Sequence, residues 1–376
     1  MRILIVNDYF EQVGGVEVYV HRVKDLLRER GHEVAVVGGK ETNSVVAGYV
    51  RSLYSFRYQR RIMDAVDQFD PDLVFCHSVI YNISPSFLRP LHRRGVPVVL
   101  TVHELNGLSF RRYPNLPPAF VLPSLLRKLL HRPLIERYVD AFVAPSSIAR
   151  HQLETEVGVD NVSVIRNPVF WEVASEPPSF GSGRVLYIGR LDRKKGVHVL
   201  VAAFADLVLR MGTGTAPTLE IVGTGEELSV LRSLVSQHSI EEHVTFTGHL
   251  DHEAVRGRYR DADVFVLPSI IEENCPLTVM EAMCQGVPVV TTDFGGQREL
   301  VAGHGCARLV PPGDADALGQ TLYDLLDDVS TLTEMGRNAV DAAADFSKER
   351  HATQLESLFQ GLVSDRRVTC QPVRSE

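Results

Sequence analysis

The chain has 376 residues, of which 44% are hydrophobic and 23% are charged, so it is long enough to form two globular cores. Its formal net charge of -8 disfavours nonspecific binding to nucleic acid, although a local basic patch remains compatible with that charge. The five cysteines are scattered and form no C-x-x-C pair, which favours reduced thiols over a disulfide framework or a zinc site. We expect neither a signal peptide nor a segment that spans a bilayer, because every apolar run is too short.

The first half of the chain alternates apolar runs with helical patterns. The apolar run 2–6 is followed by a glycine-containing turn over 11–17 and by a helix with apolar residues at helical spacing. Further buried strands are predicted at 33–39, 72–77, 96–103 and 140–146. This rhythm of strand and helix predicts a parallel sheet covered on both faces.

A stretch rich in Pro, Gly and Ser, 163–184, interrupts the rhythm and is typical of a linker between domains. The pattern then restarts with a helix at 196–211 and with strands at 184–190, 218–225, 243–250, 263–269 and 287–293. We therefore predict an α/β fold with two Rossmann-like domains, at 1–168 and 169–350. Each domain is expected to contain a doubly wound parallel sheet.

The end of the chain is predicted to be helical and then disordered. Residues 351–363 are expected to form a C-terminal helix that could cross back to the first domain, and residues 364–376 are expected to form a disordered tail.

Ligands of doubly wound sheets bind beyond the carboxyl ends of the strands, so we expect the site in the cleft between these edges of the two domains. The residues with candidate chemistry fall at those edges: Gly14, Gly15, His103, Arg190, Gly223 and the stretch from Glu273 to Glu281.

Two cations follow the first strand of the second domain. Arg190 lies just after the strand and Lys195 just before the next helix. Fixed cations can stabilise the charge that develops on a diphosphate leaving group without a metal. The alternative is a solvated basic loop, because the stretch RLDRKKG contains four basic residues.

Two carboxylates flank a predicted helix start. Pro276 suits the first position of a helix, which leaves the N–H groups of Leu277 and Thr278 able to bind a phosphate. Glu281, one turn later, could accept hydrogen bonds from a ribose diol, and Glu273 in the preceding loop could hold sugar hydroxyls. Alternatively, Glu281 only favours the helix start and Glu273 is a surface charge.

His103 and the glycine turns complete the candidates. His103 ends a strand, where a neutral imidazole could hydrogen-bond a sugar hydroxyl or have a structural role only. Gly14 and Gly15 allow a backbone to approach a ligand closely, or form an ordinary tight turn. Neither this turn nor VGTGEE (222–227) has the full G-x-G-x-x-G, and the P-loop motif is absent, so neither a dehydrogenase nor a P-loop NTPase is expected.

No metal site is predicted. Three D-x-D strings occur, Asp70/Asp72, Asp261/Asp263 and Asp314/Asp316, and such pairs can bind a divalent ion that bridges a nucleotide diphosphate. The first two precede strands, and the third opens a helix, where Asp is a common cap. We therefore interpret all three as structural.

The segment 110–138 mixes basic residues with Leu, Phe and Pro. It is a candidate for peripheral contact with an anionic membrane surface, for an apolar wall against an acceptor, or for a plain surface helix.

Together these motifs resemble those of the retaining glycosyltransferase family 4, also called glycosyltransferases group 1, which has the GT-B fold. The resemblance rests on GRLDRKKGVHVL (189–200), IVGTGEE (221–227), ADVFVLPS (262–269), the stretch 272–300 and LVPPGDADALGQTL (309–322). The first half matches more loosely, through GGVE (14–17) and His103.

The resemblance implies a role for each candidate. Arg190 and Lys195 would neutralise the donor diphosphate, Glu281 would bind the ribose, and Glu273 would contact the transferred sugar. His103 would hydrogen-bond the sugar near its reacting centre. Backbone contacts with the donor are implied for the remaining candidates: Gly14, Gly15, Gly189, Gly223, Asn274, Cys275, Pro276, Leu277 and Thr278. The loop ENCPL is less rich in glycine than in many relatives, which leaves the identity of the transferred sugar open.

The activity implied is transfer of a sugar, with retention, from a UDP- or GDP-linked donor to a hydroxyl of a saccharide, glycolipid or small-metabolite acceptor. No cofactor, metal or nucleic acid is expected to take part. The setting expected is the assembly of cell-surface polysaccharide or glycolipid, in the cytoplasm or on the inner face of the plasma membrane. A noncatalytic sugar-nucleotide-binding subunit and a sugar-nucleotide epimerase remain as alternatives.

Overall fold

The computed structural model describes residues 1–8, 15–39, 53–80, 83–103, 108, 118–211 and 217–369. The chain divides into two compact units, one formed by Met1–Asn167 with Lys348–Glu376 and the other by Pro168–Ser347. Each unit has its own sheet and its own hydrophobic core, and each is described by itself.

The first unit is built on a parallel sheet with the order β2-β1-β3-β4-β5-β6. Its strands are β1 (Arg2–Asn7), β2 (Glu33–Gly38), β3 (Leu73–Cys76), β4 (Val98–Thr101), β5 (Ala141–Ala144) and β6 (Val162–Val164). The central strands are fully buried, as their continuous apolar sequences predict. The edge strand β6 overlaps the start of the predicted linker, because a run of three residues gives little apolar signal.

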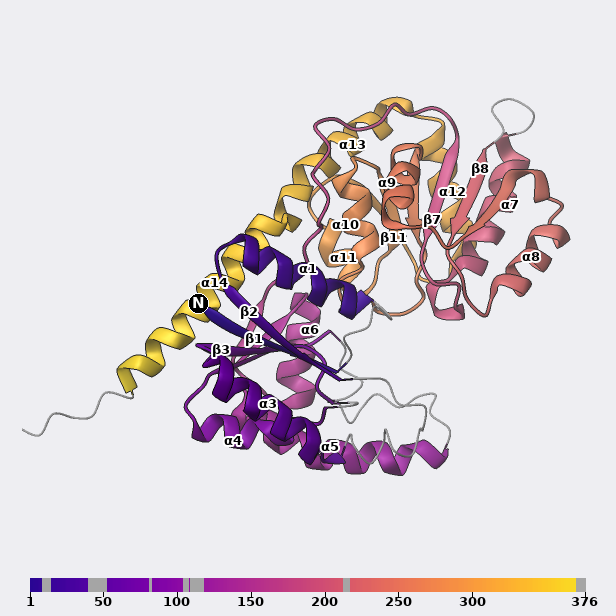
Figure 1. Cartoon of the computed structure of the whole chain (residues 1–376). Helices are drawn as coiled ribbons and strands as arrows, with labels where there is room; N and C mark the ends of the chain where they lie inside the picture. The colour runs from indigo at the N-terminus through magenta and orange to yellow at the C-terminus, as the bar shows by residue number, and fades with distance from the viewer. Residues whose placement is uncertain are drawn as a thin grey trace, which may run out of the picture. The chain divides into compact units, whose positions relative to one another are not determined.

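The helices of the first unit are α1 (Gly15–Glu29), α3 (Phe56–Phe69), α4 (Leu88–Arg93), α5 (Pro118–Tyr138), α6 (Ser147–Gln152) and α14 (Lys348–Thr369). Figure 1 shows α3, α4 and α5 along one side of the sheet, and the short turn η1 (Pro85–Phe87) contacts all three. Helices α1 and α14 contact each other on the other side.

Helix α14 is longer than the predicted C-terminal helix 351–363. It begins at Lys348 and continues to Thr369, so residues 364–369, which were predicted to be disordered, are helical. No Pro or Gly follows Gly361 before Thr369, so nothing in that sequence stops the helix. Leu355 and Phe359 are fully buried on the first unit. Residues 370–376 lie outside the described residues.

The second unit has a parallel sheet with the order β12-β11-β10-β7-β8-β9. Its strands are β7 (Arg184–Ile188), β8 (Thr218–Val222), β9 (Val244–Gly248), β10 (Val264–Leu267), β11 (Val289–Thr292) and β12 (Ala307–Val310). Strand β12 was not predicted. Its Arg308 and Leu309 are exposed, as expected of a sheet edge, so its sequence is not a continuous apolar run.

The helices of the second unit are α7 (Val197–Met211), α8 (Leu228–Gln237), α9 (His252–Arg260), α10 (Leu277–Cys284), α11 (Gly295–Val301), α12 (Ala315–Leu326) and α13 (Val329–Ala343). Helix α7 contacts α8 and α12, whereas α10 contacts α11 and α13. These two groups of helices and the parallel sheet give the doubly wound arrangement that the sequence predicts.

The aspartates of the D-x-D strings have structural partners. Asp72 accepts a hydrogen bond from the Arg2 N–H, and Asp263 accepts hydrogen bonds from the N–H groups of Gly181, Gly183 and Arg184. Asp314 caps α12 by accepting from the Ala317 N–H. In the described part of the chain, no helix is both long enough and apolar enough to cross a membrane.

Candidate active site

The predicted residues of the second unit follow the carboxyl ends of its strands. Gly189 and Arg190 come after β7, Gly223 after β8, and Glu273 after β10. The loop after β10 then leads into α10. The expected edge of this sheet therefore carries the candidate residues, as the strand order requires.

The first two of these loops are fixed by glycine. Gly223 has φ of 137°, and a Cβ atom there would lie 1.9 Å from the carbonyl oxygen of Gly189, so a larger residue cannot fit. The Gly189 N–H donates to the carbonyl of Val222, and the Leu191 N–H donates to that of Thr224. Both glycines thus hold the backbone at Arg190 in place, whether or not they also contact a ligand.

The Arg190 side chain reaches into solvent. It is 82% exposed, and its guanidinium lies 3.4 Å from the Asp192 carboxylate. Its backbone is anchored, because the buried Tyr187 hydroxyl donates to the Arg190 carbonyl at 2.8 Å. Asp192 also accepts from the Lys195 N–H and caps the short helical turn η3 (Arg193–Lys195). The loop is therefore ordered while its arginine stays accessible.

Lys195 and Glu273 are in direct contact. The Lys195 ammonium donates to Glu273 Oε1 at 2.6 Å, and the Ser269 hydroxyl donates to the same oxygen at 2.7 Å. The two charged side chains are only 19% and 14% exposed. The sequence analysis predicts that Lys195 contacts a phosphate and that Glu273 contacts a sugar. The structure shows the two side chains hydrogen-bonded to each other, so a ligand that binds one will also affect the other.

The loop that carries Glu273 is held by residues from β11 and α11. The Glu273 N–H donates to Gln297 Oε1 at 3.1 Å, and the Gly296 N–H donates to the Glu273 carbonyl at 2.6 Å. Gln297 is fully buried and donates from Nε2 to the Thr292 hydroxyl. A Cβ atom at Gly296 would lie 1.9 Å from the Asn274 carbonyl oxygen. Sequence reasoning did not single out Gln297, although its place after the glycine pair that follows β11 is a usable signal.

Helix α10 begins one residue later than predicted. Pro276 is the N-cap, with ψ of 113°, and Leu277 is the first helical residue. Proline was expected inside the first turn, but its fixed φ is compatible with the extended cap position as well. The N–H groups of Leu277 and Thr278 thus belong to the first turn, which has no intrahelical acceptors for them. Cys275 is only 9% exposed.

Glu281 lies one turn into α10, and its hydrogen-bond partner is Tyr259 rather than Lys195 or Glu273. The Tyr259 hydroxyl lies 3.1 Å from Glu281 Oε2 and equally far from the Thr278 carbonyl, and Tyr259 itself is fully buried. Burial raises the pKa of the Glu281 carboxyl to about 7, and the hydrogen bond from Tyr259 opposes that shift. Hydrogen bonds donated by the hydroxyls of a bound diol would favour the ionised form of Glu281.

His103 follows β4 of the first unit, where it joins a cluster of rings. Its Nε2 lies 3.4 Å from Nδ1 of His77, and the two imidazoles are stacked with centroids 5.6 Å apart. The Tyr19 ring from α1 packs edge-on against His103 at 4.9 Å and against His77 at 5.5 Å. The sequence predicted His103 alone and missed Tyr19 and His77.

The C-terminal helix contributes a third histidine to this cluster. His351 Nδ1 lies 2.8 Å from the carbonyl oxygen of Arg166, and because a carbonyl only accepts, that nitrogen carries the proton. His351 Nε2, 3.0 Å from the Tyr19 hydroxyl, must then be the acceptor. One hydrogen-bonded chain thus links α14 to the ring that packs against His103.

Burial keeps these imidazoles neutral. It lowers the pKa of His103 to about 4, with a further contribution from His351, and it lowers the pKa of His351 to about 4. The pKa of His77 is lowered well below its ordinary value for the same reason. Among the described residues, no group of three or more His, Cys, Asp or Glu side chains is placed to hold a metal ion.

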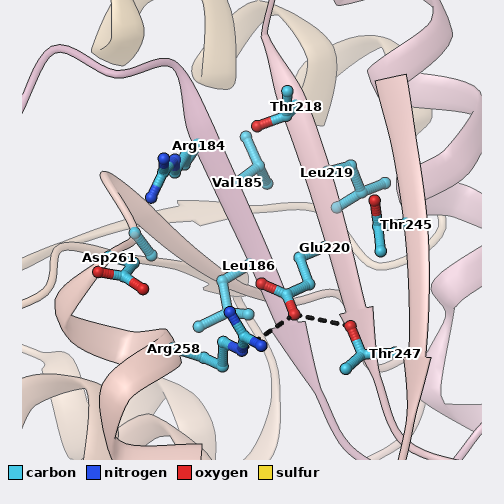
Figure 2. A pocket seen from close by; sticks show the side chains of 11 residues that line it. Arg184, Val185, Leu186, Thr218, Leu219, Glu220, Thr245, Thr247, Arg258 and Asp261 are labelled. Atoms are coloured by element: carbon cyan, nitrogen blue, oxygen red, sulfur yellow. Dashed lines mark hydrogen bonds and ion pairs between the residues drawn. The ribbon is translucent and has the colours of Figure 1, made fainter. Parts of the chain in front are cut away.

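The predicted turn at Gly14 and Gly15 is described only in part. Gly14 lies outside the described residues, and Gly15 is the first residue of α1. The second unit has a cavity of about 470 Å³. Figure 2 shows its lining, in which Glu220 accepts a hydrogen bond from Thr247 and forms an ion pair with Arg258. Arg184 and Thr218 in its lining begin β7 and β8, so it lies toward the amino ends of the strands. None of the predicted site residues lines it.

Comparison with known proteins identifies the family. Residues 175–341 match the model of glycosyl transferases group 1, and residues 13–170 match that of glycosyltransferase family 4. The phosphatidyl-myo-inositol mannosyltransferase of Mycolicibacterium smegmatis is 30% identical over 352 residues, which cover 87% of this chain and 85% of that protein. This chain belongs to glycosyltransferase family 4.

Other relatives of this glycosyltransferase differ in their named activities. A glycogen synthase of Mycobacterium tuberculosis is 32% identical over 298 residues, covering 77% of this chain and 68% of that protein. Among solved structures, the sucrose-phosphate synthase of Thermosynechococcus elongatus has a TM-score of 0.76 at 22% identity, covering 97% of this chain and all of the other, 100%. Anabaena HepE in complex with UDP has a TM-score of 0.71 at 18% identity, covering 96% and 100%. The fold of this glycosyltransferase is GT-B, as predicted.

Proposed function

We propose that this glycosyltransferase moves a hexosyl group from a UDP- or GDP-linked sugar to a hydroxyl acceptor, with retention of the anomeric configuration. The observation that carries the proposal is the joined pair Lys195 and Glu273, with Arg190 in the same loop as Lys195, at the carboxyl edge of the second sheet. Cation and carboxylate side by side suit a substrate that is anionic at its phosphates and rich in hydroxyls at its sugar.

The charge arrangement fits the departure of a nucleoside diphosphate. As the bond from the anomeric carbon to the phosphate oxygen breaks, negative charge develops on that oxygen, and Arg190 and Lys195 stabilise it. The acceptor oxygen forms its bond to the same face of the anomeric carbon, and the acceptor proton passes to the departing phosphate oxygen. No divalent ion is required in this scheme, because the two side chains supply the positive charge.

The remaining groups position the donor. The first-turn N–H groups of Leu277 and Thr278 face a phosphate, since a helix start favours anions. Glu281 holds the ribose hydroxyls, and Glu273 holds hydroxyls of the transferred sugar while its contact with Lys195 keeps both side chains in place. His103, kept neutral by burial, hydrogen-bonds the sugar near its anomeric carbon.

The relatives support the substrate class at this level. One is named a phosphatidyl-myo-inositol mannosyltransferase and another a glycogen synthase, so members act on lipid-linked or saccharide hydroxyls. HepE has been solved with UDP and glucose, which supports a nucleotide-sugar donor. We propose a role in glycolipid or surface-polysaccharide assembly at the cytoplasmic side of a membrane.

A donor screen tests the proposal. The melting temperature of the full chain is measured with UDP-, GDP- and ADP-linked hexoses, because a ligand of the folded state raises it by mass action. The best donor is then incubated with glycolipid and saccharide acceptors, with and without EDTA, and the product linkage is determined by NMR. We expect one nucleotide to stabilise the protein and the product to retain its configuration.

Other outcomes exclude the proposal in different ways. Donor stabilisation without transfer to any acceptor would favour a noncatalytic binding subunit. An epimerised sugar formed without acceptor would identify an epimerase. An inverted product, or activity that disappears with EDTA, would remove the retaining or the metal-independent part of the scheme.

A further inference from the structure

Helix α5 buries two polar residues and exposes four leucines, which is the reverse of an ordinary surface helix. Lys128 and His131 are buried, with exposed fractions of 0% and 1%. Four leucines of the same helix face outward: Leu122 at 75% exposed, Leu126 at 45%, Leu129 at 63% and Leu130 at 47%. Their spacing of three and four residues places them along one stripe. Such a stripe in water forgoes the free energy of burying its leucines.

Exposed cations lie on α5 and on the other helices of the same side of the sheet. Helix α4 contacts α5 and presents exposed Arg89 and Arg93, and α5 itself ends with exposed Arg137. Helix α3, which contacts η1 as α4 and α5 do, adds exposed Arg57 and Arg60. We call these five arginines and the four leucines the α3–α5 face.

Two exposed aromatic side chains lie at the beginning of α3. Phe56, at the start of α3, is 76% exposed, and Tyr54 just before it is 47% exposed. Their rings lie 4.5 Å apart. Aromatic and leucine side chains between cations are typical of proteins that lie in a membrane interface.

The charge of the α3–α5 face is opposite to that of the whole chain. Helices α3, α4 and α5 carry only three acidic residues, Asp64, Asp67 and Glu136. The protein as a whole has a net charge of -8, so a basic face on it is a local feature rather than a consequence of composition. An anionic surface is the partner that complements it, and apolar contact with that surface would cover the leucines.

We propose that the α3–α5 face binds the surface of an anionic lipid bilayer, with the leucines of α5 in the headgroup–acyl boundary and the arginines against lipid phosphates. The helix lies on the membrane and does not span it, since no helix among the described residues meets the requirements for spanning. This placement extends beyond the sequence prediction for 110–138, because α3 and α4 supply most of the cations. It would bring the first unit to a surface where lipid-linked acceptors reside.

Vesicle binding tests the proposal without any sugar donor, so its result is independent of the proposed transfer reaction. The full chain is sedimented with vesicles of phosphatidylcholine alone and of phosphatidylcholine mixed with phosphatidylglycerol. We expect binding to the anionic vesicles only, weakening as salt is added because the electrostatic part is screened.

Two pairs of substitutions separate the apolar and the charged parts. Leu126→Ser with Leu129→Ser should weaken binding by about tenfold or more, and Arg89→Gln with Arg93→Gln by about fivefold for each arginine. The matched controls are Leu209→Ser on α7, where Leu209 is 81% exposed, and Arg337→Gln on α13, both in the second unit. The controls should bind as the wild type does, and circular dichroism should show every variant folded.

Three results would overturn the proposal. Equal binding to neutral and anionic vesicles would remove the charge argument, and unchanged binding of both double variants would remove the α3–α5 face. A wild-type dimer that the leucine double variant converts to a monomer, with no vesicle binding by either, would identify a second copy of the chain as the partner.

Discussion

The two units hold their candidate residues in opposite ways. In the second unit the candidates are charged and paired, with Lys195 on Glu273 and Arg190 reaching into solvent. In the first unit His103 is neutral and packed among Tyr19 and two further imidazoles. Two opposite charges in contact with some water can both stay ionised, whereas desolvation of a buried imidazole favours its neutral form. The second unit is therefore suited to bind an anion, and the first to donate or accept a single hydrogen bond.

The largest effect is expected from removing the cationic member of the charged pair. Lys195→Ala should lower turnover by about 100-fold or more, because it removes a charge that acts on the leaving group. Steady-state kinetics with the best donor measure the loss. Lys194→Ala changes an exposed neighbour and serves as the matched control. Turnover in the Lys195 variant equal to that of the control would show that the charged pair of the second unit is structural only.

The carboxyl of Glu281 gives the second unit a pH dependence. Burial raises its folded pKa to about 7, above the ordinary value, so this group costs stability as pH rises from the ordinary value through the folded one. Glu281→Gln cannot ionise and should exceed the wild type in unfolding free energy by about 2 kcal/mol near pH 8. Denaturant titrations at several pH values measure this.

The control for that prediction is the same comparison at about pH 4, where the difference should become small because the Glu281 carboxyl is largely protonated in both the folded and the unfolded chain. The same variant should bind nucleotide about tenfold more weakly, since an amide is a poorer acceptor than a carboxylate. An offset that is equal at both pH values would mean that packing, not ionisation, causes it.

The hydrogen bond from Tyr19 to His351 tests how the first unit positions His103. Tyr19→Phe keeps the ring and removes the hydroxyl, so the ring and His103 lose their anchor on α14. We expect about a tenfold lower kcat with donor affinity unchanged, as small misplacements of a reacting group have effects of this order. Kinetics and donor titration together give the two quantities. A fall in donor affinity with unchanged kcat would contradict the assigned role.

The imidazoles of the first unit should make it sensitive to acid, opposite in sign to Glu281. The folded pKa of His77 lies below its ordinary value, so the unfolded chain binds more protons and stability falls as pH drops below that ordinary value. His77→Asn removes one such group. Between about pH 7 and 5 the variant should lose about 1 kcal/mol less than the wild type. Identical pH slopes would show that the pKa of His77 is the same in the folded and the unfolded chain.

The smallest effect is expected at the ion pair that holds the middle of α14 to the first unit. Glu356 accepts two hydrogen bonds from Arg30 and lies 3.0 Å from His32 Nε2. These side chains are partly exposed, so Glu356→Gln should lower the melting temperature by about 1–3 °C and leave kcat unchanged. The variant is also the control for Tyr19→Phe. A loss of kcat here would mean that any loosening of α14 disturbs His103.

The amino-acid sequence is sufficient to predict the two parallel sheets, their central strands and the candidate residues of the second unit. Central strands are buried on both faces and therefore read as continuous apolar runs, and the stretches 189–195 and 269–281 contain both members of the Lys195–Glu273 pair. Three features depend on contacts between distant parts of the chain: β6 and β12 are edge strands, Gln297 supports the Glu273 loop, and His351 contacts Tyr19, 332 residues away. The periodicity of apolar residues shows which face of a helix or strand is buried. It does not show which distant element packs against that face, because such pairings arise only when the chain folds.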